Sequence, residues 1–158
     1  MPTDDLQHLR RAIALSQEGM EREDGGPFGA VIVKAGRVVA EGNNRVVVDA
    51  DPTAHAEVVA IRRACAELGD FSLAGAVLYA SCEPCPMCLA AAYWSRVDRV
   101  VFAGGRQDAA AIGFDDAFFY EQLPLPIEQR SLPMTQQLRD EAVVPMRAWQ
   151  AKQDKTLY

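Results

Sequence analysis

Apolar residues recur at roughly helical spacing at the start of the chain. Residues 4–20 place leucine, isoleucine and methionine behind two acidic residues, which predicts an amphipathic helix that ends near Gly19. Two apolar runs follow, at 28–33 and 37–40, with a Gly-Gly-Pro turn before them and an Ala-Gly pair between them. These signals predict an antiparallel β-hairpin.

A second helical pattern begins after the Asp-Pro-Thr stretch at 51–53. Alanine, valine and isoleucine recur there with a 3.6-residue period until Gly69. We expect Thr53 to be the N-cap, so that the helix starts just before His55 and ends at Gly69. A short β-rich run at 75–81 follows and leads directly into a cluster of cysteines.

The next segments repeat this order of helix and strand. The stretch PMCLAAAYW is rich in helix formers, with Pro86 suited to a first turn, and residues 98–105 are typical of a strand followed by glycines. A hairpin followed by helix, strand, helix and strand predicts a three-layer α/β domain with a partly parallel central sheet. Beyond this point the pattern weakens, and we expect a loop or short helix at 106–120 and a closing helix from Pro145.

Composition narrows the class of protein. A chain of 158 residues with 49% hydrophobic content suits one globular domain over residues 1–158. No apolar run approaches the length of a bilayer span and no leader pattern opens the chain, so we expect a cytoplasmic protein without a membrane partner. The 22 acidic and 16 basic residues give a formal charge of -6, which argues against nucleic acid as a partner.

Three of the four cysteines fall within the stretch SCEPCPMC. They are too few and too clustered for a secreted disulfide framework, and such a cluster more often indicates a metal or catalysis. Cys85 and Cys88 share one face of a predicted first helical turn, where the helix dipole favours thiolates. With His55, at the start of the preceding helix, they supply three ligands suited to Zn²⁺ and leave a fourth position for water, as in catalytic zinc sites.

Glu57 turns this metal site into a candidate reaction centre. It follows His55 by two positions at the start of the same predicted helix. Its carboxylate can therefore lie beside the water without binding the metal. From there it can take a proton from the water and deliver it to the substrate, which is the role of a general acid and base.

The cysteines also allow other interpretations. A bare Cys-x-x-Cys is typical of a thioredoxin-like redox pair, but that interpretation does not account for the upstream His-x-Glu. Cys82 would add a third sulfur and make a closed structural zinc site with His55. That second interpretation leaves Glu57 without a function.

At these residues the chain resembles a known family. His-Ala-Glu at 55–57 and Pro-Cys-Pro-Met-Cys at 84–88 match the H-x-E…P-C-x-x-C signature of zinc-dependent nucleobase and nucleoside deaminases. The stretches GGPFGAVIVK, EGNN, DPTAHAE, LYASCEPCPMC, YWSR and GFDDAFFY are similar to those of bacterial guanine deaminases, and the resemblance covers nearly the whole chain. It implies a three-layer α/β/α cytidine deaminase-like fold with a central mixed sheet of five strands.

The resemblance also implies an activity and an assembly. Members of that family convert guanine, a free purine base, into xanthine and ammonia, with one Zn²⁺ per subunit. They form homodimers that exchange C-terminal segments, here about residues 130–158, so that a terminal tyrosine reaches the partner's active site. We therefore expect a zinc-dependent hydrolase that deaminates guanine in purine metabolism, by attack of water on the carbon that bears the amino group.

Carried over position by position, the resemblance implies roles for individual residues. Zinc is bound by His55, Cys85 and Cys88, and Glu57 is the proton shuttle. In the pocket, the resemblance implies that Phe28 stacks on the purine ring, that Asn44 hydrogen-bonds the purine edge and that Ala56 offers backbone groups. It also implies that Trp94 contacts the substrate and that Asp116 contacts or protonates the exocyclic amine. Tyr158 would close the partner's pocket. The ending KTLY departs from the family's KKEY-like ending, although tyrosine remains last.

Residue chemistry agrees with these pocket roles but does not require them. An aromatic face suits a flat heterocycle, and an amide that presents both a donor and an acceptor suits an edge that mixes them. Without the resemblance, several residues would be interpreted as structural or solvated: Phe28, Tyr93 and Trp94 as core, Cys65 as core filler, His8 as a structural residue, Asp115 and Asp116 as a solvated pair, and Tyr158 as a frayed end.

Three other functions remain open from the sequence. A tRNA adenosine deaminase shares the same motifs but needs a basic surface for an anticodon stem, which the acidic charge disfavours. A deaminase of guanosine or of another small amino-heterocycle would differ only in its pocket walls. A zinc-stabilised binding module without catalysis would need the metal to fold and would release no ammonia.

Overall fold

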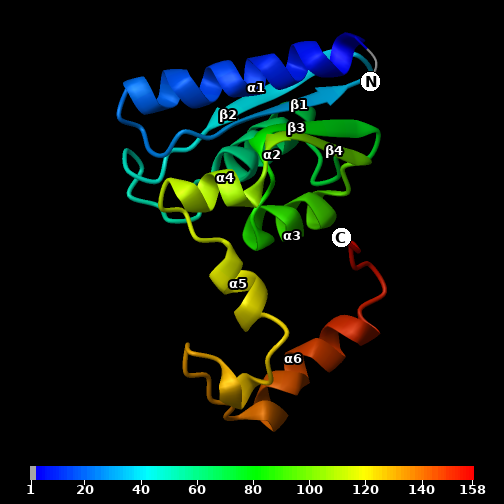
Figure 1. The fold of residues 1–158 in the computed structure, drawn as a ribbon. Helices are drawn as coiled ribbons and strands as arrows, with labels where there is room; N and C mark the ends of the chain where they lie inside the picture. The colour runs from blue at the N-terminus through cyan, green and yellow to red at the C-terminus, as the bar shows by residue number, and fades with distance from the viewer. Residues whose placement is uncertain (1–2) are drawn as a thin grey trace. The chain divides into compact units, whose positions relative to one another are not determined.

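The computed structural model describes residues 3–158, which form two compact units that divide after Ala117. The elements of the first unit are α1 (Thr3–Glu21), β1 (Gly29–Lys34), β2 (Arg37–Asn43), α2 (Ala56–Leu68), β3 (Ala76–Cys82), α3 (Pro86–Ser95), β4 (Arg99–Gly104) and α4 (Arg106–Ala111) (Figure 1). Those of the second unit are α5 (Ala117–Gln122), which starts at the boundary, the 3₁₀ helix η1 (Ile127–Gln129) and α6 (Arg139–Ala151). The prediction of one deaminase domain over residues 1–158 stays a prediction.

The sheet of the first unit has the strand order β2-β1-β3-β4. β1 pairs antiparallel with β2 and β3, whereas β3 and β4 are parallel, so the predicted hairpin and partly parallel sheet are confirmed. The prediction of five strands is wrong, because the described residues form a sheet of four. After β4 the chain turns at Gly105 into α4, and the prolines of residues 123–133 remove amide donors that a fifth strand would need.

The side chains of β1 alternate between two hydrophobic cores. Ala30 and Ile32 pack with residues of α2 and α3, whereas Val31 and Val33 pack with residues of α1. All four are buried. Because successive side chains of a strand point to opposite faces, a strand with two buried faces is apolar throughout. α1 covers one face of the sheet, and α2 and α3 cover the opposite face. The predicted α/β/α layering is therefore confirmed.

Two glycines that were both expected to end helices differ in the structure. Gly69 ends α2 in the left-handed conformation, with φ of 63°, as predicted. α1 instead continues past Gly19, where a side chain would overlap Asn43, so this glycine permits a close approach of the helix to β2. Neither α1, with its 19 residues, nor any other described helix is long and apolar enough to cross a membrane.

The start of α2 also differs from the prediction. Its N-cap is His55 and not Thr53. The backbone N–H and the hydroxyl of Thr53 both donate to the Asp51 carboxylate, at 2.8 and 2.7 Å, which holds Thr53 in the turn before the helix. The imidazole of His55 makes no capping hydrogen bond, so it is available for another role.

Asp5 connects α1 to two strands of the sheet. It is 2% exposed and accepts hydrogen bonds from the Tyr79 hydroxyl at 2.6 Å and from the Arg99 guanidinium at 2.8 and 2.9 Å. The bonds from Arg99 and then from Tyr79 lower the pKa of Asp5 to about 2. The His8 ring lies 5.1 Å from the Tyr79 ring between centroids, which agrees with a structural role for His8.

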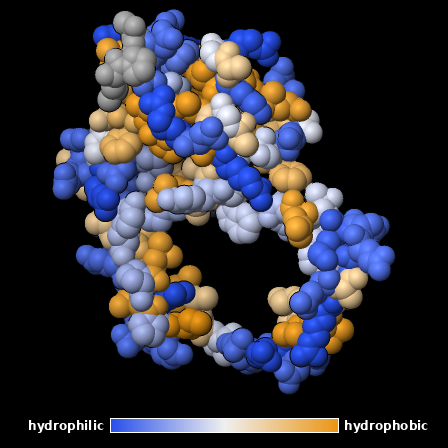
Figure 2. All heavy atoms as spheres, turned by 90° about the vertical axis from the view of Figure 1, so that its right-hand side faces the viewer, coloured by the Kyte–Doolittle hydropathy of each residue, from blue (hydrophilic) through white to orange (hydrophobic). Residues whose placement is uncertain are grey.

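The second unit contains one longer helix, α6. It starts at Arg139 and contains Pro145, so the predicted start at Pro145 is wrong. Asp140 and Glu141 place negative charge in the first turn, where the helix dipole favours it. None of the residues from 118 to 158 is buried, and Figure 2 shows apolar side chains, in orange, at the surface in this part of the chain.

Candidate functional site

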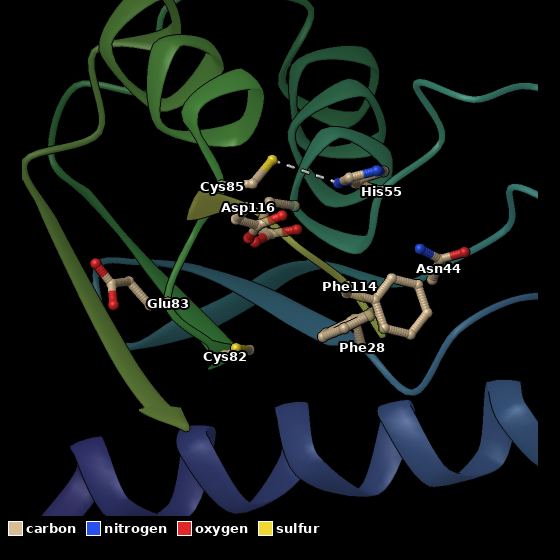
Figure 3. Close-up of a pocket in the computed structure, with 9 residues that line it drawn as sticks. Phe28, Asn44, His55, Cys82, Glu83, Cys85, Phe114 and Asp116 are labelled. Carbon is tan, nitrogen blue, oxygen red and sulfur yellow. Dashed lines mark hydrogen bonds between the residues drawn. The ribbon is translucent and has the colours of Figure 1, made fainter. Parts of the chain in front are cut away.

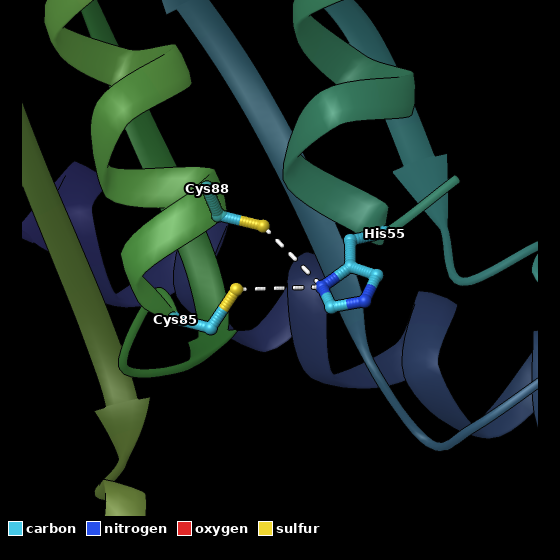
Figure 4. Close-up of side chains that lie close together, drawn as sticks. All are labelled: His55, Cys85 and Cys88. Atoms are coloured by element: carbon cyan, nitrogen blue, oxygen red, sulfur yellow. Dashed lines mark hydrogen bonds between the residues drawn. The ribbon is translucent and has the colours of Figure 1, made fainter. Parts of the chain in front are cut away.

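Two helix starts in the first unit bring three metal-binding side chains together. His55 is the N-cap of α2 and Cys85 is the N-cap of α3, and neither side chain caps its own helix. His55 Nδ1 lies 3.6 Å from Cys85 Sγ and 3.5 Å from Cys88 Sγ (Figure 4). The three ligand atoms lie within 4.8 Å of one another. The three predicted zinc ligands therefore meet at one point.

The spacing of these atoms fits a tetrahedral zinc ion. Bonds of about 2.3 Å to sulfur and about 2.05 Å to nitrogen, held at the tetrahedral angle, place sulfur and nitrogen roughly 3.6 Å apart. The two observed sulfur–nitrogen distances are 3.6 and 3.5 Å. Nδ1 is therefore the nitrogen of His55 that would bind the metal, and one imidazole with two thiolates is a donor set that zinc favours.

Cys82 stands outside this group. Within the part of the chain that the structure describes, His55, Cys85 and Cys88 form the metal-binding group without it. The Cys82 thiol lies at the end of β3, with Sγ 3.6 Å from the Gly105 carbonyl oxygen. The alternative of a closed site with three sulfurs is therefore not supported, and three protein ligands leave a tetrahedral ion one open position.

The surroundings of the two thiols favour metal binding. A hydrogen bond from the Cys88 thiol, assisted by His55, lowers the pKa of Cys85 to about 4 although burial opposes this. The pKa of Cys88 is raised because its proton is held in the bond to Cys85. The neighbouring Cys85 raises the pKa of His55. These surroundings therefore favour the thiolate form of Cys85, which is the form of cysteine that binds metals.

Two carboxyl groups lie beside the metal-binding group. Glu57 is 7% exposed and lines the same pocket as His55 and Cys85. Burial raises the pKa of Glu57. Asp116 is half-buried in that pocket, and its pKa is raised first by burial and then by the charge of Cys85. Carboxyl groups with raised pKa values in a cleft are suited to exchanging protons near neutral pH.

The pocket is a hollow of about 400 Å³ in the first unit, including its open mouth (Figure 3). Nine residues line it: Phe28, Asn44, His55, Glu57, Cys82, Glu83, Cys85, Phe114 and Asp116. Six of these were predicted as site residues from the sequence. They come from strand ends, helix starts and loops that are far apart in the chain, so the pocket forms only when the sheet and helices pack.

Three of the lining residues were not predicted as pocket residues from the sequence: Cys82, which was considered only as a possible zinc ligand, and Glu83 and Phe114, which were missed. The Phe114 ring packs edge-on against Phe28, with centroids 4.9 Å apart and planes at 88°. Glu83 forms an ion pair of 2.8 Å with Arg106, which connects the loop before α3 to the start of α4. The signal that could have found Phe114 is its position two residues before Asp116 in the GFDD stretch.

Comparison with known proteins agrees with this geometry. The zinc-binding region of the cytidine and deoxycytidylate deaminases matches residues 2–104. The chain belongs to this deaminase family. The family predicted from the H-x-E and P-C-x-x-C motifs is confirmed, and so is zinc as its cofactor.

Relatives of this deaminase differ in how much of the chain they match. The guanine deaminase of Bacillus subtilis is 50% identical over 150 residues, which cover 95% of this chain and 96% of that protein. Its X-ray structure matches with a TM-score of 0.93 at 49% identity, over 96% of this chain and 97% of the other. A guanine deaminase structure from Nitrosomonas europaea matches with a TM-score of 0.65 at 35% identity, over 69% and 63% of the two chains. The tRNA-specific adenosine deaminase of Bacillus subtilis is 40% identical over 100 residues, or 63% of this chain and 62% of that protein.

The remaining predicted substrate residues of this deaminase lie elsewhere in the fold. Ala56 is buried in the core at the first turn of α2 and does not line the pocket. Trp94 is near the end of α3, is 66% exposed, and does not line the pocket of its own unit either. Tyr158 belongs to the second unit, where it lines a groove together with Trp149 of α6. Contacts of these three residues with a substrate stay predictions.

Proposed function

We propose that this deaminase converts guanine and water into xanthine and ammonia. The observation that carries the proposal is the buried Glu57 beside a group of three metal ligands that leaves one metal position open. An identity of 50% to a guanine deaminase, over almost the whole chain, supports guanine as the substrate. The reaction forms a C2–O bond and breaks the bond between C2 and the exocyclic amino nitrogen of guanine, so that the amino group leaves as ammonia.

Glu57 carries the protons of this reaction. His55, Cys85 and Cys88 would hold a zinc ion, which when bound would supply a water molecule of lowered pKa as the nucleophile. Glu57 accepts a proton from the attacking water, delivers it to the purine ring, and later transfers a proton to the leaving amino group. Its raised pKa suits both directions of transfer, because the protonated form is then populated closer to neutral pH.

The other pocket residues bind and orient the base. Phe28 and Phe114 offer aromatic surface to a flat ring, and Asn44 hydrogen-bonds its edge. Asp116 contacts the exocyclic amine and assists its protonation, a role supported by the raised pKa of this carboxyl group. Ala56 contributes backbone groups at the first turn of α2.

We also propose that the protein is a homodimer, with one zinc ion per subunit, that exchanges C-terminal segments of about residues 130–158. The second unit supports this, because none of its residues is buried and many large apolar side chains are exposed: Leu132, Leu138, Val144, Met146, Trp149 and Leu157. A segment that buries no apolar side chain needs another surface to be stable. In the exchanged dimer Tyr158 closes the partner's pocket, and Trp94 adjoins the substrate.

We also propose a cytoplasmic location, which the chemistry of the site supports. Zinc binding requires Cys85 and Cys88 as free thiolates, and a reducing compartment preserves them in that form. The formal charge of -6 supports a small purine base as substrate, since a nucleic-acid backbone would be repelled.

The experiment that tests the function is ammonia release from guanine, guanosine, adenine, cytosine and an anticodon stem-loop. The variant Glu57→Gln keeps the shape of the side chain but removes its acid–base function. We expect guanine to be turned over by the wild type and the rate to fall by a factor of about 10³ in the variant, at unchanged zinc content. Glu67→Gln, an exposed glutamate on the same helix, is the matched control and is expected to keep full activity.

Other outcomes of this assay identify the alternatives. Turnover of the stem-loop in place of guanine would assign the protein to the tRNA adenosine deaminases, one of which matches 63% of the chain. Turnover of guanosine would retain the mechanism and change the substrate. If the zinc-loaded wild type released no ammonia from any compound, the protein would be a non-catalytic zinc module.

A further inference from the structure

We propose that Glu83 and Arg106 form a positioning pair, which holds the segment 105–116 so that Asp116 and Phe114 reach the pocket beside the metal-binding group. Neither member of the pair needs to touch the substrate for this role. The role rests on the proposed function, because the two groups that it positions serve the same reaction.

Both oxygens of the Glu83 carboxylate accept hydrogen bonds from one residue, Arg106. Oε1 accepts from the guanidinium Nη2 at 2.8 Å. Oε2 accepts from the guanidinium Nε at 3.4 Å and from the backbone N–H at 3.2 Å. A planar guanidinium that meets a carboxylate at both of its oxygens has a defined orientation as well as a defined distance. The pair can therefore fix the direction of the chain at Arg106.

The bond from the backbone N–H lies at the start of α4. Arg106 is the first residue of this helix, after Gly105. The first N–H groups of a helix have no partner within the helix and need an acceptor from elsewhere. Gly105 has no side chain that could supply one. Glu83 supplies it from a different segment, so the start of α4 is attached to the loop that leads into α3.

Backbone contacts hold this loop in place. The Glu83 N–H donates to the Gly104 carbonyl oxygen at 2.8 Å, and the Cys82 thiol lies 3.6 Å from the Gly105 carbonyl oxygen. Cys82 is also paired with Gly104 in the parallel ladder of β3 and β4. The metal ligand Cys85 follows two positions after Glu83. The Glu83 end of the pair is therefore fixed relative to the metal-binding group.

Packing alone holds α4 weakly. The helix has six residues, and Ala109 is its one buried residue. Short helices depend on contacts with the rest of the protein for their stability, and a single small side chain provides few of them. The ion pair at the start of α4 therefore contributes much of what determines the direction of this helix.

The end of α4 carries two pocket residues. The Phe114 N–H donates to the Ala109 carbonyl oxygen at 3.0 Å, and the Asp116 N–H donates to the Phe114 carbonyl oxygen at 3.2 Å. Both side chains line the pocket, and the Phe114 ring packs against Phe28. Because these hydrogen bonds connect the turn to the helix, a change in the direction of α4 would displace Phe114 and Asp116 together.

The geometry of Glu83 favours this indirect role over a direct one. Glu83 lines the pocket, but Figure 3 shows its carboxylate turned away from His55 and Asp116. Arg106 is not among the residues that line the pocket. A proton carrier would need a carboxylate oxygen that faces the substrate, whereas both oxygens of Glu83 face Arg106.

The first test breaks the pair with Glu83→Gln, which keeps the shape of the side chain but places an NH₂ group against the donors of Arg106. We expect kcat for guanine to be about tenfold lower at unchanged zinc content, because small displacements of reacting groups strongly reduce the rate. Glu18→Gln removes an ion pair of 2.7 Å with Arg11 outside the pocket and is the matched control, expected to keep the wild-type kcat. The double variant Glu83→Gln/Arg106→Gln should be as active as Glu83→Gln alone.

The second test asks whether the pair acts through Asp116. In an Asp116→Asn background, Glu83→Gln should lower kcat by about threefold or less, because the group that the pair positions is already disabled. In an Asn44→Ala background the factor should remain about ten, since Asn44 belongs to a different segment. A purely structural role would lower kcat by the same factor in both backgrounds. Thermal unfolding shows that the variants are folded, and a half-exposed ion pair should change the melting temperature little.

The outcomes separate this inference from the proposed function. A Glu83→Gln variant with the wild-type kcat, or an equal effect of Glu83→Gln in the Asp116→Asn and Asn44→Ala backgrounds, would overturn the inference while guanine deamination stands. Loss of zinc from Glu83→Gln would also overturn it, because the pair would then act on the metal ligands. A zinc-loaded wild type that is inactive on guanine would overturn both.

Discussion

His55 Nδ1 lies 3.5 Å from Cys88 Sγ, although 33 residues separate the two in the chain. The contact arises because the first turns of α2 and α3 pack together through a small apolar cluster of Val58, Cys85 and Cys88. Helix packing therefore holds the ligands at the spacing that zinc requires. The adjacent Glu57 belongs to the same first turn as His55, so the metal and the proton carrier are positioned by one structural unit.

Removal of one ligand should release the metal. We expect Cys85→Ala to bind less than about a tenth of the zinc that the wild type retains after dialysis, and to lose its deaminase activity, because two ligands hold zinc weakly. Cys82→Ala is the matched control from the same motif and should retain one zinc ion per chain. Elemental analysis of both variants measures this. Equal zinc loss in the two would show that Cys82 is a ligand after all.

Phe114 should contribute to substrate binding through its contact with Phe28. We expect Phe114→Ala to raise KM for guanine by about tenfold with a smaller change in kcat, because the aromatic wall is lost while the metal site is intact. Phe102→Ala, an exposed residue of β4 outside the pocket, should leave KM unchanged. Steady-state kinetics of both variants measure this effect. A similar KM in Phe114→Ala and the wild type would show that Phe114 does not contribute to substrate binding.

Asp5 should make stability depend on pH in acid. Its pKa is about 2 in the folded protein and about 3.9 in an unfolded chain. Its ionised form therefore contributes stability that is complete above about pH 4 and is lost as the pH falls through about 2. We expect the melting temperature of Asp5→Asn to be several degrees below that of the wild type at neutral pH, with a difference that shrinks between pH 4 and 2.

The control for this prediction is Asp4→Asn, which changes the exposed neighbour on the same helix. Thermal unfolding of the three proteins across this pH range is the measurement. A constant difference between wild type and Asp5→Asn at all pH values would mean that the ionised Asp5 carboxylate does not stabilise the fold through Arg99 and Tyr79.

Exchange of the C-terminal segments can be tested by mixing two inactive variants. One is Glu57→Gln, and the other lacks Tyr158. In an exchanged dimer of the two, one site combines an intact Glu57 with the partner's Tyr158. An unfolded and refolded equal mixture should therefore recover about a quarter of the wild-type activity, since about half of the dimers are mixed and each has one complete site. No recovery in a mixture that is dimeric by light scattering would place Tyr158 in its own chain's site, whereas full activity of the variant that lacks Tyr158 would place this residue outside any site.

The chemistry of the site could be predicted from the sequence because it depends on local features. The ligand types, the spacing of Cys85 and Cys88 and the acidic residue two positions after His55 all lie within single helical turns. The alternation of apolar residues likewise predicted most strands and helices to within a few positions. The exceptions were ends such as Thr53, where a turn to Asp51 competes with the helix cap.

The sequence by itself thus determined the set of reactive groups, the family and the order of helices and strands, because residue identity and short-range periodicity carry that information. Only the tertiary structure decided that the described sheet has four strands, that Phe114 faces Phe28, and that Glu83 pairs with Arg106. These features depend on contacts between distant segments. Such contacts have no signature in the local sequence, because they depend on which side-chain orientations the packed layers permit.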